Sequence, residues 1–313
     1  MANVPTRLSA FTGAEPRFAL FSYENRRAIL PYLYIAPAVA LFFLLMLFPM
    51  AMVFRYSLLE GAILSPAPVF VGLDNFRQIF ADPVFRQSIG QTLYFTVMSV
   101  VFHLIIGLAF ALMLNSKRIN PTARAILRVL YILPWLFTAV IIAIIWRLIL
   151  DPNGVVNSVL IEIGIVDFKI EWFSSPSTAI HALTFVNIWA GYPLYMVTLL
   201  AGLQGISEEL YEAAEIDGAS ATQQLWHVTL PQLRPIIVSI ALLDFIWTMQ
   251  VFPLVWMTTG GGPIHSTEMM SVYTYKLAFS RFQFSLASAS AVVIFILSMS
   301  MTYFYIRHQK AAR

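Results

Sequence analysis

Long apolar runs separated by polar or charged segments dominate the sequence. A helix needs about 20 mostly apolar residues to cross the hydrocarbon core of a bilayer. The first run is longer than the apolar core of a signal peptide, so we expect it to remain as a membrane span. The pattern predicts an all-α integral membrane protein with six transmembrane helices. The six runs cover residues 28–53, 87–116, 129–146, 172–207, 235–257 and 282–306.

The segments between the runs suggest further elements. Those at about 56–86, 150–178 and 259–281 are longer than turns and contain glycine, proline and aromatic residues, so we expect short interfacial helices and caps there. No internal repeat is evident. The predicted organisation is an N-terminal segment (1–27), a six-span domain (28–306) that contains a polar loop (205–235), and a C-terminal tail (307–313).

The distribution of basic residues predicts the orientation. If the N-terminus lies inside, twelve of the 19 lysine and arginine residues fall on inner segments and seven on outer segments. Basic residues near span ends favour the cytoplasmic side of a membrane. We therefore expect a multi-pass protein with both termini, and the polar loop 205–235, in the cytoplasm.

Composition excludes several functional classes. Only 11% of the residues are charged and 59% are hydrophobic, whereas soluble globular chains carry about 25% charged residues. The absence of cysteine excludes disulfides, thiolate metal sites and cysteine nucleophiles. No histidine pattern indicates a metal site, and no catalytic elbow or pair of intramembrane aspartates indicates an enzyme. None of the four lysines follows a glycine, so the chain has no phosphate-binding loop for ATP.

The polar loop predicts a helix–turn–helix. Ser207 is a plausible N-cap for a first helix, because two glutamates follow it in the first turn. The pair Asp217-Gly218 ends that helix, since glycine adopts the left-handed conformation that helix ends require. Ser220 begins a second helix and forms a capping box with Gln223.

The first of these helices has an unusual surface. Leu210, Ala213 and Ala214 share one face at helical spacing, and small side chains allow another backbone to come close. Glu208 and Glu212 are like charges one turn apart, which destabilises an isolated helix slightly. Basic groups on a partner would remove this repulsion. The alternative is a solvated amphipathic loop.

The same loop resembles the "EAA" loop of ABC-importer permeases. The residues that carry the resemblance are Glu212-Ala213-Ala214, Asp217-Gly218-Ala219, Leu230-Pro231 and Pro235. Three further stretches are similar to the sugar-type permeases of the maltose and glycerol-phosphate importers. These stretches are VGLDNFRQIF (71–80), NIWAGYP (187–193) and TTGGGP (258–263).

The resemblance implies a type I importer permease fold whose cytoplasmic coupling helix docks in a cleft of an ATPase. The coupling residues would be Glu212, Ala213, Ala214, Asp217, Gly218, Ala219, Leu230 and Pro231. The implied partners are a second permease subunit, a dimeric cytoplasmic ATPase that binds ATP and Mg, an extracytoplasmic solute-binding protein and membrane lipid. No nucleic acid and no cofactor on this chain are expected. The implied location is the inner membrane of a bacterium or archaeon.

Polar residues inside the fourth and fifth spans are the candidate substrate contacts, because polar groups inside a membrane are costly and commonly face a pathway. Their neutral hydrogen-bonding groups suit a hydroxylated solute such as a sugar, and Pro193 is expected to interrupt the fourth helix. The candidates are Asn187, Gly191, Tyr192, Tyr195, Asp244, Thr248 and Gln250. The resemblance places sugar contacts at Asn187, Gly191, Tyr192, Thr248 and Gln250.

Each candidate also has a structural alternative. Asn, Thr and Gln often join transmembrane helices by hydrogen bonds. Asp244 could pair with a group on a partner subunit, and His103 in the second span is expected to form a helix–helix hydrogen bond rather than a proton relay.

At the level of function, the main alternative is a secondary transporter, or half of one, driven by an ion gradient. Such folds often contain repeats and several buried ions. Here Asp244 is the one clear intramembrane carboxylate.

Overall fold

The computed structural model describes residues 23–116 and 118–311, and the chain divides into two compact units, residues 1–52 and 53–313. Most of the predicted N-terminal segment 1–27 thus lies outside the described residues, as do the last two residues of the predicted tail. In the first unit, α1 (Tyr23–Phe42) and the π-helical turn η1 (Phe43–Leu47) lead into α2 (Phe48–Ser57). From Leu30 to Ser57 this helix is long and apolar enough to cross a membrane, and its most apolar stretch buries no residue within the chain.

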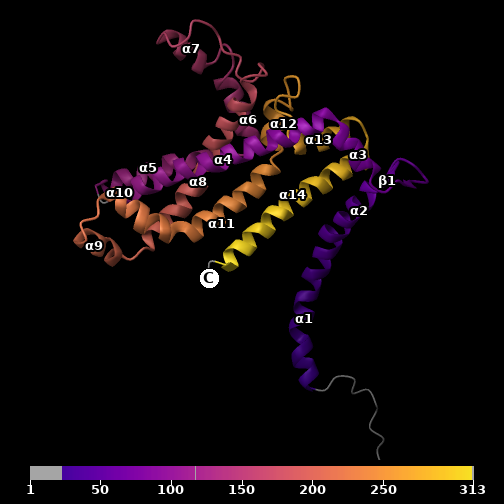
Figure 1. The fold of residues 1–313 in the computed structure, drawn as a ribbon, viewed down its shortest axis with the longest axis horizontal. Helices are drawn as coiled ribbons and strands as arrows, with labels where there is room; N and C mark the ends of the chain where they lie inside the picture. The colour runs from indigo at the N-terminus through magenta and orange to yellow at the C-terminus, as the bar shows by residue number, and fades with distance from the viewer. Residues whose placement is uncertain (1–22, 117, 312–313) are drawn as a thin grey trace, which may run out of the picture. The chain divides into compact units, whose positions relative to one another are not determined.

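The second unit is built around four long helices (Figure 1). α4 packs along α8 and also contacts α11, while α14 contacts α11 and α3. These helices are apolar around most of their circumference, which is typical of membrane spans. Their bounds are α4 (Pro83–Asn115), α8 (Ala179–Gln204), α11 (Leu230–Met249) and α14 (Phe284–Ala311).

The third predicted span is bent. α5 (Pro121–Leu136) and α6 (Ala139–Ile149) meet at an angle of 100°. The backbone is extended at Phe137 and Thr138, and the Thr138 hydroxyl accepts a hydrogen bond from the Ile141 amide at 3.4 Å, which caps α6. The apolar run 129–146, predicted as one transmembrane helix, thus covers parts of two helices that meet at a bend. Among the described residues, five helices can span a membrane, and a sixth span is present if the bent pair is counted as one.

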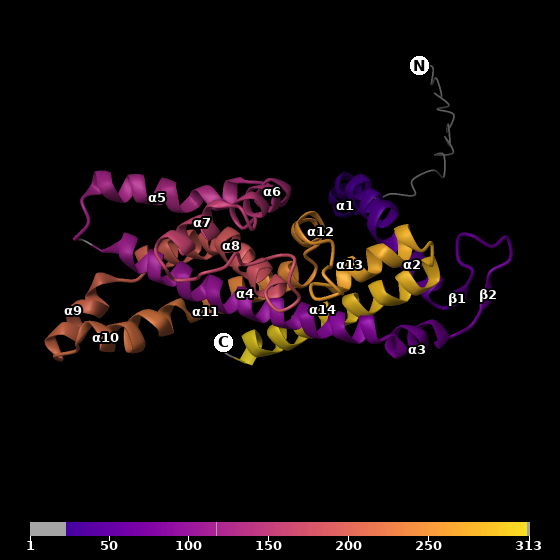
Figure 2. The same cartoon turned by 90° about the horizontal axis from the view of Figure 1, so that it is seen from above.

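Most of the short elements lie toward one end of the second unit, whereas the helix that follows α6 lies apart from them (Figure 2). The three connecting segments contain helices, as predicted, whereas the small antiparallel hairpin β1–β2 was not predicted. The predicted fifth span, 235–257, is also interrupted, because α11 ends at Met249 and a separate helix starts at Pro253. These elements are β1 (Leu59–Glu60), β2 (Val69–Phe70), α3 (Asp74–Ala81), α7 (Val155–Glu162), α12 (Pro253–Thr258), α13 (Met270–Tyr275) and η3 (Lys276–Ser280).

The polar loop lies at the opposite end of the second unit (Figure 2). It forms α9 (Glu208–Ile216) and α10 (Ala221–Gln224), followed by the π-helical turn η2 (Leu225–Thr229). The helix–turn–helix is confirmed. Its second helix runs through η2 into α11 and forms one helix from Ala221 to Met249.

The core of the second unit holds α4, α8 and α11 close together. Tyr195 and Met196 of α8 are fully buried in a cluster that includes Leu233 of α11. Gly107 permits the close approach of α4 to α8, because a Cβ atom at this position would lie 2.4 Å from the Cβ of Tyr195. This tight packing brings polar side chains from three helices into contact.

Candidate translocation cavity and coupling loop

A buried imidazole connects three helices of the second unit. His103 of α4 lies with its Nδ1 atom 2.8 Å from Oδ2 of Asp244 on α11. Its Nε2 atom lies 2.9 Å from the backbone carbonyl oxygen of Asn187 on α8. A carbonyl oxygen can only accept, so Nε2 carries a proton, and Nδ1 and the carboxyl group share a second hydrogen bond. The helix–helix hydrogen bond expected for His103 is therefore present.

Asp244 receives further hydrogen bonds from its own chain. The Tyr195 hydroxyl donates to Oδ2 at 3.0 Å, and the Thr248 hydroxyl donates to Oδ1 at 2.9 Å. The Asp244 side chain is 11% exposed. The Asp244 carboxyl group is therefore paired within the chain.

Gly191 lets the imidazole reach these partners. A Cβ atom on Gly191 would lie 2.3 Å from the Cε1 and Nε2 atoms of His103. Real Cβ atoms do not approach so closely, and close approach of this kind is one of the uses of glycine. Any larger residue at this position would displace the ring from Asp244.

A cavity of about 210 Å³ opens beside this network, which we call the central cavity. It lies at the bend between α5 and α6, and side chains of α8 and α11 form its other walls. The Asn187 amide donates to the Ser99 hydroxyl at 2.9 Å, and its Oδ1 atom accepts no hydrogen bond from the described residues. The lining residues are His103, Pro134, Trp135, Phe137, Ala139, Ile142, Asn187, Ala190, Gly191, Asp244, Thr248, Val251 and Leu254.

The structure brings together four of the seven candidate substrate residues, Asn187, Gly191, Asp244 and Thr248, around the central cavity. The other three do not line it. Tyr192 packs against the ring of Phe110 with centroids 5.2 Å apart, and Tyr195 lies fully buried behind Asp244. Gln250 donates to the Ser298 hydroxyl on α14 at 3.3 Å.

Two features of the cavity were missed or misread from the sequence. α8 is continuous through Pro193, so the predicted interruption is absent. The interruption that does shape the cavity lies at Phe137 and Thr138. The sequence signal for this bend was Pro134 followed by Thr138, a residue type that often caps helices. Hydrophobicity averaged along the run does not reveal this signal. His103 was recognised as a helix contact, yet its place in the cavity wall was not predicted.

The polar loop 205–235 has most of the local geometry expected from its sequence. Gly218 has a φ angle of +77°, in the left-handed region. Ser220 and Gln223 form the predicted capping box, since the Ser220 hydroxyl accepts from the Gln223 amide and the Gln223 side chain accepts from the Ser220 amide. Ser207 occupies the N-cap position of α9 without a side-chain hydrogen bond to the helix.

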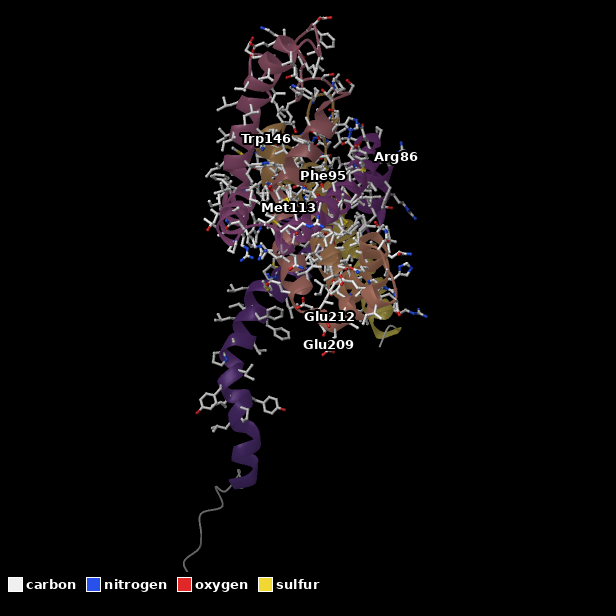
Figure 3. The ribbon with its side chains drawn as sticks, turned by 90° about the vertical axis from the view of Figure 1, so that its left-hand side faces the viewer. Arg86, Phe95, Met113, Trp146, Glu209 and Glu212 are labelled. Carbon is white, nitrogen blue, oxygen red and sulfur yellow. The ribbon has the colours of Figure 1, made fainter. Side chains whose placement is uncertain are left out.

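α9 presents an uncovered surface. None of its residues is buried, and Ile216 is 87% exposed. Figure 3 shows Glu209 and Glu212 at the surface of the second unit, far from Trp146 of α6. The Tyr211 hydroxyl lies 3.0 Å from that of Thr229, which ties α9 to η2 and so to α11. The loop thus has an exposed helix surface and a side-chain hydrogen bond to the helix that continues into α11.

The fold and these sites define a polytopic membrane permease subunit, without a catalytic constellation among the described residues. Residues 103–310 match the family described as "Binding-protein-dependent transport system inner membrane component". The chain belongs to this family. It is a multi-pass inner membrane protein and a permease subunit of an ABC importer, not an enzyme.

Individual relatives agree with this assignment. The chain is 33% identical to the trehalose/maltose transport system permease protein MalF of Thermococcus litoralis, over 80% of this chain and 84% of the relative. It is 34% identical to the lactose transport system permease protein LacF of Rhizobium radiobacter, over 79% and 83%. These matches do not favour a transporter driven by an ion gradient.

A solved structure shows the same fold. This is a chain of a bacterial alginate ABC transporter in complex with an alginate pentasaccharide-bound periplasmic protein. The TM-score is 0.79 at 23% identity, and the match covers 90% of this chain and 94% of that chain. The predicted type I importer permease fold is thereby confirmed.

Proposed function

We propose that this chain forms half of the pathway through which an ATP-driven importer carries a sugar or sugar-like solute. A second permease subunit would form the other half. An extracytoplasmic solute-binding protein would deliver the solute, and a dimeric cytoplasmic ATPase would bind ATP and Mg. The trehalose/maltose and lactose permeases among the relatives support a saccharide as the solute.

The central cavity is the observation that carries this proposal. Its polar groups include the Asn187 Oδ1 atom and the Thr248 hydroxyl, and Trp135 adds an aromatic wall. Neutral donors and acceptors suit the hydroxyl groups of a sugar. Its volume of about 210 Å³ is below the roughly 300–1,000 Å³ of typical ligand pockets. A second permease that completes the cavity would account for this difference.

The loop around α9 supports coupling to a separate ATPase. Its exposed apolar residues include Leu210, Ile216 and Trp226, and exposed apolar groups rimmed by charge are typical of protein interaction sites. We propose that α9 docks on the ATPase, with Glu212 opposite a basic group. The proposed coupling residues remain Glu212, Ala213, Ala214, Asp217, Gly218, Ala219, Leu230 and Pro231. This places α9, α10 and both termini in the cytoplasm.

Transport by a reconstituted complex tests the cavity. Thr248→Val removes a hydroxyl from the cavity wall and should lower uptake about five-fold, since one hydrogen bond contributes about 1 kcal/mol. Thr184→Val is the matched control, because Thr184 is buried on α8, donates only to the Ile180 carbonyl and does not line the cavity. The ATPase should assemble with both variants. Equal uptake by Thr248→Val and wild type would place the substrate site elsewhere.

ATP hydrolysis stimulated by the loaded binding protein tests the coupling surface. The Glu212 side chain has no hydrogen bond or ion pair with the described part of the chain, so Glu212→Arg should leave the fold intact. The reversal should set like charges against each other and reduce stimulation and uptake. Glu162→Arg, an equally exposed reversal on α7, should have no effect. Wild-type stimulation in Glu212→Arg would mean that this residue does not face a basic group.

A further inference from the structure

A second pocket lies along the α4–α8 pair, toward the end of the second unit opposite α9. Its volume is about 440 Å³, within the range of small-molecule sites. Its polar walls come from Gln91 and Tyr94 of α4, His181 of α8, and Ser266 in the loop before α13. The nine lining residues include no Lys, Arg, Asp or Glu, so the pocket is suited to an uncharged ligand.

Two polar atoms in the pocket residues lack partners. Ser266 is 9% exposed, and its Oγ atom has no hydrogen-bond partner among the described residues. The same holds for the Oε1 atom of Gln91, whose amide nitrogen donates to the His265 carbonyl at 2.9 Å. Buried polar atoms are paired in the large majority of cases. Two residues that line the same pocket therefore carry a buried polar atom that needs a partner.

An aromatic pair completes the pocket. The Tyr94 hydroxyl lies 2.7 Å from Nδ1 of His181, and the two rings meet edge to face with centroids 5.6 Å apart. Tyr94 is 36% exposed, so part of its ring is open to a ligand. Aromatic side chains combine an apolar face with a polar tip. A sugar presents the matching chemistry, with hydroxyl groups around an apolar ring face.

The second pocket and the central cavity follow one another along the same two helices. On α4, Gln91 precedes His103 by a distance of about 18 Å at 1.5 Å per residue. On α8, His181 precedes Asn187 by about 9 Å. Counted from the end of the second unit opposite α9, the second pocket therefore comes before the central cavity along these helices.

We propose that the second pocket is a saccharide site, in which the side chains of Gln91 and Ser266 turn toward the pocket and their buried oxygen atoms form hydrogen bonds with sugar hydroxyl groups. The site rests on the proposed function, because that function makes the solute a sugar. It adds a second sugar-binding site to the proposed pathway, separate from the candidate residues of the fourth and fifth spans.

Removal of the Ser266 hydroxyl gives a clean test. Ser266→Ala deletes no hydrogen bond within the described residues, so its thermal stability should equal that of the wild type. Uptake at subsaturating loaded binding protein should fall about three- to ten-fold, the effect of one lost hydrogen bond to the ligand. Thr96→Val is the matched control. Thr96 lies on α4, and its buried hydroxyl also lacks a partner among the described residues, yet it does not line the pocket.

Cysteine protection provides a readout that is independent of transport. The chain contains no cysteine, so Ile264→Cys introduces a unique thiol at a lining position that is 82% exposed. Maltose, trehalose or lactose should slow maleimide labelling of this thiol in the purified complex. The same sugars should not protect Glu162→Cys, which is exposed on α7.

The outcomes separate the two proposals. If the wild type imports a sugar while Ser266→Ala matches Thr96→Val and no sugar protects Ile264→Cys, the second site is wrong and the proposed function stands. If the wild type imports none of the sugars and none protects the thiol, both proposals are wrong. Protection by the unloaded binding protein alone would identify a protein-docking surface and overturn the saccharide site.

Discussion

The His103 imidazole lies 2.8 Å from the Asp244 carboxyl group, and this contact joins α4 to α11 in the interior of the second unit. Because His103 also contacts the Asn187 carbonyl, one side chain links three helices that form walls of the central cavity. Polar residues that connect helices and polar residues that line a cavity are usually treated as alternatives. Here His103 and Asp244 do both.

Loss of the Asp244 carboxyl group should destabilise the protein. Asp244→Ala leaves His103, Tyr195 and Thr248 without their shared hydrogen-bond partner. A buried polar group that is left unsatisfied costs about 1–3 kcal/mol. The unfolding temperature in detergent, monitored by size-exclusion chromatography after heating, should fall markedly. Asp74→Ala is the control, because Asp74 pairs with Arg77 while both side chains are mostly exposed. Equal unfolding temperatures for the two variants would contradict the prediction.

An added methyl group at Gly191 should disturb the same network. Gly191→Ala would push the His103 ring away from Asp244, and overpacking of this kind costs about 1–3 kcal/mol. Gly90→Ala provides the comparison. Gly90 lies in α4, and a methyl group there would have no neighbouring atom within 4 Å, so alanine should stabilise the helix by about 0.5–1 kcal/mol. The unfolding temperature should therefore fall in Gly191→Ala and rise in Gly90→Ala. A Gly191→Ala variant as stable as the wild type would disprove the requirement for glycine at this position.

Efficient coupling of ATP hydrolysis to transport should require glycine at position 218, in the turn between α9 and α10. Gly218 has a φ of +77° with open space around it, so Gly218→Val introduces backbone strain of at least about 1–2 kcal/mol without a clash. Gly164→Val is closely matched, with a φ of +73° and equally open space after α7. Both variants should fold, but only Gly218→Val should reduce ATP hydrolysis stimulated by the binding protein. Equal stimulation would show that the turn geometry has no part in coupling.

The orientation of the chain can be measured directly. Thr222→Cys places a unique thiol on α10 and leaves the capping box of Ser220 and Gln223 intact. An impermeant maleimide should label it only from the cytoplasmic side. Asp167→Cys, in the exposed loop after α7, should show the opposite pattern in sealed cells. Labelling of Thr222→Cys from outside would reverse the proposed topology.

The sequence predicted best those features that depend on a few adjacent residues. The turn at Gly218 and the capping box at Ser220 follow from local backbone chemistry, and both are present. Long apolar runs likewise identified the spans. The bend at Phe137 was missed because hydrophobicity does not change there, and only the backbone conformation does.

The composition of the cavity could be predicted only in part. Polarity marked Asn187 and Thr248 correctly as cavity residues, whereas Tyr195 and Gln250 use their polar groups on neighbouring side chains instead. Which of these occurs depends on the rotation of each helix about its axis. That rotation is set by contacts between distant segments, such as Gly107 against Tyr195, and not by the pattern along one helix.

The unbroken helix from Ala221 to Met249 has a mechanical consequence. One end of this rod carries the turn at Gly218, and near its other end Asp244 and Thr248 face the central cavity. Ala221 and Thr248 are about 40 Å apart at 1.5 Å per residue. A tilt at one end of a continuous helix displaces the other end, and the π-helical turn η2 lies between α10 and the cavity residues of this helix. A movement of α10 would therefore shift Asp244 and Thr248 and change the shape of the proposed solute pathway.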